Sequence, residues 1–100
     1  MTTTAPVTTE TILDRYADDI AFVAEEQPAT TLAALAEQVS TAGERLGEAR
    51  INGAEDLETA ADALRAVEDT PLESRHVFLR HAARHLRHVG DMADEYRDMV

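Results

Sequence analysis

The stretch Thr30–Ile51, "TTLAALAEQVSTAGERLGEARI", decides the fold class because its apolar residues recur in steps of three and four. These residues are Leu32, Leu35, Val39, Ala42, Leu46 and Ala49. An α-helix completes one turn in about 3.6 residues, so this spacing places all of them on one face. The stretch is therefore predicted to form a helix that buries a single apolar stripe.

The same spacing recurs in three other parts of the chain. The stripe residues there are Leu13, Tyr16, Ile20 and Val23, then Leu57, Ala60, Leu64 and Val67, and finally Leu72, Leu79, Ala82, Leu86, Val89, Ala93, Tyr96 and Val100. No segment alternates with the period of two that a half-buried strand requires. Because the connections are short, neighbouring helices should run antiparallel. We therefore predict an all-α, antiparallel bundle of about four helices.

The predicted helix boundaries rest on residues with special backbone preferences. Pro28 moves the residue before it out of the helical conformation, so it ends the first helix. Thr30 or Thr31 can cap the second helix, and Asn52–Gly53 can end it in the left-handed conformation. Thr70–Glu73 has the residues of a capping box with proline in the first turn, so it predicts the start of the last helix.

The last apolar stripe predicts a long C-terminal helix over residues 71–99. At about 1.5 Å per residue this helix would be roughly 42 Å long, against about 25 Å for the first helix. Tyr96 and Val100 continue the stripe past Gly90 without a change of phase, which favours a continuous helix. Its excess length would leave apolar side chains uncovered by their own chain, so we predict a homodimer. The predicted interface residues are Phe22, Phe78, Met92, Tyr96 and Met99.

The chain is strongly acidic, with 20 Asp and Glu against nine basic residues and a net charge of −11 at pH 7. Such a charge repels phosphate backbones, so nucleic-acid binding is not expected. It also destabilises the compact state unless salt screens it. The acid excess, the 18 Ala and the absence of Lys resemble the cytoplasmic proteins of extreme halophiles. We therefore expect a salt-adapted protein.

The remaining composition indicates one domain without a membrane segment. The first ten residues lack the basic and apolar regions of a secretory signal, and no apolar run approaches the length of a bilayer span. There is no cysteine, which excludes disulfides and cysteine-based metal sites. We expect residues 1–9 to form a disordered tail and residues 10–100 a single helical domain in the cytoplasm.

One stretch has the opposite charge to the rest of the chain. Arg75–His88, "RHVFLRHAARHLRH", contains all four His, four of the nine basic residues and no acid. Arg80, Arg84 and Arg87 are expected to offset acidic faces of neighbouring helices or of a second subunit, through exposed ion pairs worth about 0–1 kcal/mol each. The favoured function is accordingly a small protein-interaction or structural module, without catalysis and without a cofactor.

The histidines of this stretch suggest an alternative function in metal binding. His81, His85 and His88 are spaced i, i+4 and i+7, so they share one flank of a continuous helix. Two neutral imidazoles at this spacing can chelate a transition metal, and Glu95 could add a carboxylate from the same flank. The alternative is thus a helical protein that binds Zn or Ni.

A second alternative comes from Arg80–His85, "RHAARH", which resembles the Arg-x4-His motif of the HEPN superfamily of helical nucleases and their inactive relatives. The resemblance covers these six residues. It implies that Arg80 and His85 act on a scissile phosphate at a dimer cleft. Arg87 stands where that family has an aromatic residue, so the implied function is a degenerate nucleotide-handling domain.

Overall fold

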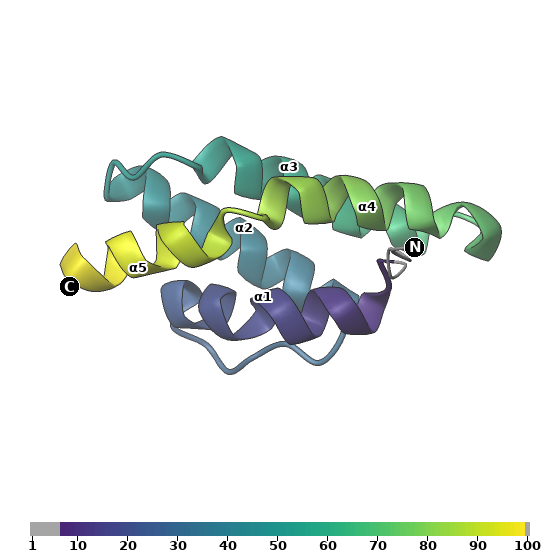
Figure 1. Cartoon of the computed structure of the whole chain (residues 1–100), viewed down its shortest axis with the longest axis horizontal. Coiled ribbons are helices and arrows are strands. Elements are labelled where there is room, and N and C mark those ends of the chain that lie inside the picture. The colour runs from purple at the N-terminus through teal and green to yellow at the C-terminus, as the bar shows by residue number, and fades with distance from the viewer. Residues whose placement is uncertain (1–6, 100) are drawn as a thin grey trace, which may run out of the picture.

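Every regular element of the described structure is helical, as the apolar stripes predict. The computed structural model describes residues 7–99 (Figure 1). Its elements are α1 (Thr9–Ala24), α2 (Leu32–Glu48), α3 (Ala54–Glu68), the short 3-10 helix η1 (Leu72–Ser74), α4 (Arg75–Leu86) and α5 (Val89–Met99). The all-α class is confirmed, whereas the antiparallel order of the helices and the dimer stay predictions.

Helix α1 begins inside the predicted tail, residues 1–9. The Thr8 hydroxyl accepts a hydrogen bond from the Thr11 amide at 3.2 Å, and the Thr11 hydroxyl accepts one from the Thr8 amide at 2.6 Å. This reciprocal pair is a capping box, with Thr in the place usually held by Glu or Gln. Thr8 and Thr9 therefore belong to the helical domain, and residues 1–6 of the predicted tail lie outside the described residues.

The connection from α2 to α3 corrects the predicted role of Asn52–Gly53. Helix α2 is closed by Arg50, which has a φ of 60°, and by the Ile51 amide, which donates to the Leu46 carbonyl at 2.9 Å. Gly53 follows at the N-cap of α3 with a φ of 116°. The glycine is thus required to start α3, and α2 has already ended before it.

Replacing Gly53 with Ala is expected to lower the free energy of unfolding by about 1–3 kcal/mol. A Cβ here would lie 1.8 Å from Met92 Sδ, and the positive φ strains any other residue. The matched change is Gly47→Ala, at a position inside α2. Its Cβ would lie 3.8 Å from the Ala54 Cβ, which is an ordinary contact, so the change should raise the free energy of unfolding by about 0.5–1 kcal/mol. Urea unfolding measures both variants, and changes of equal sign would contradict this geometry.

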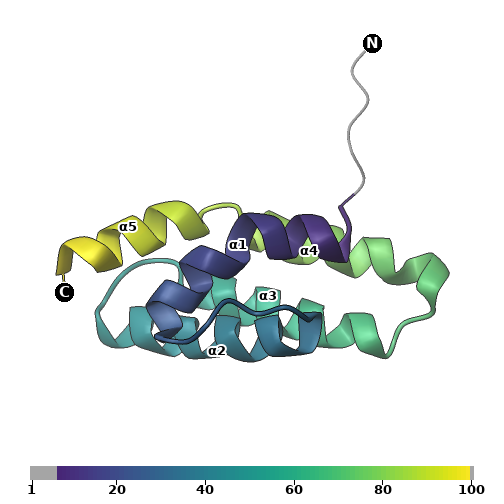
Figure 2. The same ribbon diagram turned by 90° about the horizontal axis from the view of Figure 1, so that it is seen from below.

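Two layers of helices enclose the core. Figure 2 shows α1, α4 and α5 lying over α2 and α3. Helix α3 packs against α2 and α4, and α1 packs against α2 and α5. The largest fully buried side chains include Ile12, Ile20, Leu35, Leu46, Leu57, Leu64 and Leu86. All of these except Ile12 belong to the predicted stripes, so the helix faces were assigned correctly from sequence.

The long C-terminal helix predicted over residues 71–99 is divided in the structure. Helix α4 ends at Leu86, a turn follows at Arg87–His88, and α5 begins at Val89 (Figure 1). Gly90 is the second residue of α5, so the break lies before it. The prediction of one continuous helix is therefore wrong.

The start of this region also differs from the prediction. The Thr70 hydroxyl donates to the Ala66 carbonyl at 2.7 Å and so completes the end of α3. Pro71 is extended, with a ψ of 146°, and η1 intervenes before α4 begins at Arg75. The predicted capping box at Thr70–Glu73 does not form, because the Thr70 hydroxyl is used by the preceding helix.

The break at Arg87–His88 is explained by burial. Leu86 before it is 0% exposed and Val89 after it is 3% exposed, so the apolar stripe stays covered on both sides. Helix α4 rests on α3, whereas α5 rests on α1. A lost helical hydrogen bond costs a net of about 0.5–1.5 kcal/mol. Burying one large apolar side chain stabilises by about 1.5–3 kcal/mol, so covering both Val89 and Met92 outweighs the break.

Candidate binding surface on helix α4

Helix α4 has one buried face and one open face. Its buried residues are Leu79, Ala82 and Leu86. Val77, His81 and Arg84 are spaced i, i+4 and i+7, so they share the opposite face, and all three are exposed. The open face therefore mixes an aliphatic side chain with cationic and imidazole groups.

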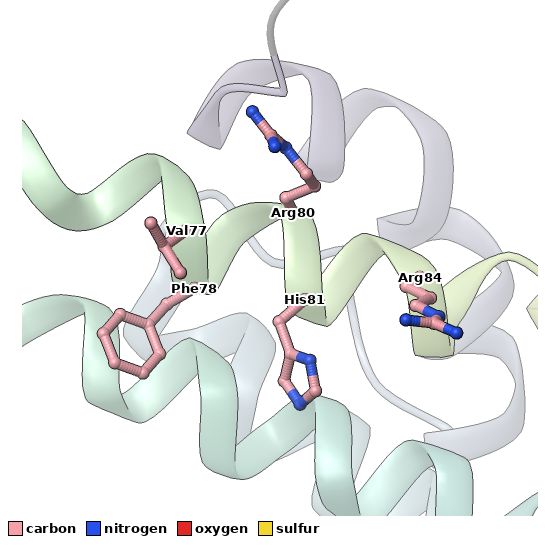
Figure 3. Close-up of a pocket in the computed structure, with 5 residues that line it drawn as sticks. All are labelled: Val77, Phe78, Arg80, His81 and Arg84. Atoms are coloured by element: carbon pink, nitrogen blue, oxygen red, sulfur yellow. The ribbon is translucent and has the colours of Figure 1, made fainter.

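A shallow groove of about 480 Å³ runs along this open face. It is lined by Val77, Phe78, Arg80, His81 and Arg84, which together we call the α4 groove (Figure 3). Figure 3 shows Phe78 and His81 pointing to one side of the helix and Arg80 to the other. Val77 is 55% exposed, and Leu72 in the adjoining η1 is 80% exposed. An exposed apolar patch rimmed by polar groups is typical of a contact surface.

The arginines of the α4 groove form no ion pair within residues 7–99. Five carboxylates of that range do pair with arginine, and the arginines are Arg45, Arg65 and Arg97. Arg80, Arg84 and Arg87 were expected to offset the acids of neighbouring helices. No such pair forms in the described part of the chain, so their charge is directed outward.

His85 is the one histidine with a carboxylate partner among the described residues. Its Nδ1 lies 3.0 Å from Oδ1 of Asp56, in the first turn of α3. Because an ionised carboxylate only accepts hydrogen bonds, the Nδ1 atom of His85 is the donor in this pair. The His81 ring meets the His85 ring edge to face, with 4.8 Å between centroids. This arrangement ties α4 to α3 and fixes the His85 imidazole.

The four predicted metal ligands divide into two places. His81 and His85 are neighbours on α4, whereas His88 and Glu95 line a second cavity of about 280 Å³ beside Gly53. The break after Leu86 is responsible, because His88 no longer continues the flank of α4. Within residues 7–99 no group of three His, Asp or Glu could hold a metal ion. Binding of Zn or Ni stays a prediction, without support from this geometry.

The two residues of the HEPN-like motif are also separated within the chain. Arg80 lines the α4 groove, but His85 does not and is bonded to Asp56 instead. The groove residues include no carboxylate, hydroxyl or thiol that could act as a nucleophile. The predicted dimer cleft stays a prediction, and the single chain has a groove at this position.

One of the predicted interface residues is buried in its own chain. Met92 is 5% exposed, and its thioether lies against Gly53. Ala93 is 0% exposed. Both residues are covered by their own chain, so the excess length of the predicted C-terminal helix no longer argues for a dimer. Phe78 is half-buried in the α4 groove, and Met99 is 57% exposed.

Phe22 and Tyr96, also predicted at an interface, join α1 to α5. Their rings meet edge to face, with 6.2 Å between centroids. The Arg97 guanidinium lies 4.5 Å from the centroid of the Phe22 ring and donates to Asp19 at 3.1 Å. The hydrogen bond that Arg97 donates to Asp19 is the main cause that raises the pKa of Arg97 above its ordinary value. These contacts hold α5 on α1, although Phe22 remains 40% exposed.

Several residues that matter here were missed from the sequence. Leu72 was assigned to a buried stripe, yet it is largely exposed because η1 precedes α4. Val77 had a detectable signal, since it lies off the stripe and among Arg and His. Asp56 and Arg97 had none, because their partners His85 and Asp19 are remote in sequence.

The structure is an all-α fold with a groove on α4 that is lined by cationic and apolar side chains. Comparisons with protein-family models, with curated proteins and with solved structures found no match to this chain. Among residues 7–99 no helix combines the length and the apolar character needed to span a membrane.

Proposed function

We propose that this chain is a small, salt-adapted protein-interaction module without catalytic activity, located in the cytoplasm, and that the α4 groove is its contact surface. The observation that carries the proposal is the combination of Arg80 and Arg84, which form no ion pair within residues 7–99, with the exposed Val77 beside them. Arginine is enriched where proteins meet, and a desolvated carboxylate partner would satisfy it.

The chemistry of the groove favours binding over catalysis. Acid–base or nucleophilic catalysis needs reactive groups within hydrogen-bond reach of one another. The groove has one imidazole, His81, and no carboxylate beside it. The histidine that does have a carboxylate partner, His85, lies outside the groove lining. A surface that recognises a partner requires only complementary shape and charge.

The homodimer predicted from sequence remains part of the proposal, but with fewer interface residues. The exposed apolar residues available to it on the α1–α5 side are Phe22 and Met99. Met92 cannot contribute, because it is buried in its own chain. A dimer formed there would leave the α4 groove open.

The proposed function is tested by capturing partners with the immobilised protein and two variants. Val77→Gln with Arg84→Gln alters the groove, and Ala33→Gln with Arg50→Gln makes the matched change at exposed positions elsewhere. A protein captured through the groove is purified and its affinity measured. We expect the groove variant to bind about ten-fold more weakly and the control to bind normally. Equal affinity of the purified partner for both variants would refute the function.

A further inference from the structure

We infer that the occupant of the α4 groove is a short, acidic, amphipathic helix of another protein. This inference rests on the proposed function and adds the chemistry of the partner. Helix α4 has 12 residues, which at about 1.5 Å per residue gives a surface of roughly 18 Å. A helical segment of similar length covers it completely.

The charge of the groove selects carboxylates. Arg80 and Arg84 are one turn apart in sequence and both exposed, so each guanidinium group can take a carboxylate of a partner. In the sequence, the cationic stretch Arg75–His88 is preceded by Glu73 and followed by Asp91. A short segment fits between these two acids. A long polyanion such as RNA would extend beyond them, over a chain whose net charge is −11.

The apolar residues of the groove require an amphipathic occupant. Val77 and Phe78 both line the groove, and more than half of the surface of Val77 is exposed. A Leu or Phe of the partner packed against Val77 and Phe78 would remove this surface from water. An amphipathic helix supplies one apolar row with acids on its flank, so it offers partners both to the apolar residues and to the arginines of the groove.

The α4 groove of a second copy does not suit this surface. Two α4 grooves packed directly against each other would bring two cationic stretches together. Like charges placed directly opposite one another are destabilising. The surface of the partner that meets the α4 groove must therefore be acidic.

The test uses fluorescence anisotropy with a labelled helical peptide of about 14 residues, in which Leu recurs in steps of three and four and Glu flanks it. We expect saturable binding that the change Arg80→Gln with Arg84→Gln weakens about ten-fold. Arg15→Gln with Arg50→Gln makes the same charge change at exposed positions outside the groove, so it should alter the affinity by less than about two-fold. Circular dichroism confirms that both variants are folded.

Two control peptides and one nucleic acid complete the experiment. A Gln version of the peptide and a shuffled version with the same charge should both bind at least about ten-fold more weakly. Absence of binding by the acidic peptide would overturn this inference, and groove-dependent capture of another kind of protein would leave the proposed function intact. A single-stranded DNA 12-mer that binds with the same dependence on Arg80 and Arg84 would overturn both.

Discussion

Replacing Met92 with Asp is expected to lower the free energy of unfolding by at least about 3 kcal/mol. Met92 is 5% exposed, and the cavity that it borders is also lined by Asp56, Asp91 and Glu95. A new carboxylate would lose its hydration there and meet like charges at short range. Small domains are stable by about 5–15 kcal/mol in total, so the variant should be close to unfolding. Urea denaturation monitored by circular dichroism measures the loss.

The matched control is Met99→Asp, which introduces the same charge on the same helix. Met99 is 57% exposed, so its replacement should change the free energy of unfolding by less than about 0.5 kcal/mol. The comparison tests whether α5 packs on its own chain. If α5 instead contacted a second subunit, Met92→Asp would halve the mass measured by light scattering and leave the fold of each subunit intact.

The melting temperature is expected to rise by roughly 10 °C or more as KCl increases from about 0.1 M to about 3 M. Eighteen of the 20 acidic side chains are exposed, and five carboxylates pair with arginine within residues 7–99. Most of the negative charge therefore repels itself across the surface. In a domain of this size, each kcal/mol added to the free energy of unfolding raises the melting temperature by about 4–8 °C.

The contribution of charge is isolated by Glu44→Gln with Glu68→Gln, two exposed acids without an ion pair in the described structure. This variant should melt above the parent at about 0.1 M KCl and lose that advantage at about 3 M, where the Debye length is below about 3 Å. Calorimetry at both salt concentrations measures the effect. A flat or falling response of the parent protein would exclude salt adaptation.

The helix faces could be predicted from the sequence because each apolar stripe lies on one side of one helix. Leu35, Leu46 and Leu64 are all buried as expected. The break after Leu86 could not be predicted, since neither glycine nor proline stands at Arg87–His88 and the stripe continues in phase beyond it. Only the covering of Val89 by another helix distinguishes the broken helix from the continuous one.

The candidate surface was predictable in part. The cationic stretch stood out by composition, and the position of Arg80 on it followed from helical periodicity. Whether these arginines form ion pairs within their own chain depends on where the acidic side chains lie in space. This could not be predicted from the sequence. His81, His85 and His88 do not share one helix flank as predicted, for a related reason. The break between α4 and α5 separates His88 from the other two histidines.

The most direct test of the account is to map where the acidic peptide binds. Amide chemical shifts of the ¹⁵N-labelled protein are recorded during titration with that peptide. We expect the largest changes on the α4 groove, at Val77, Phe78, His81 and Arg84, and no change on α2. Changes centred on the α1–α5 side around Phe22, or the absence of any change, would contradict it.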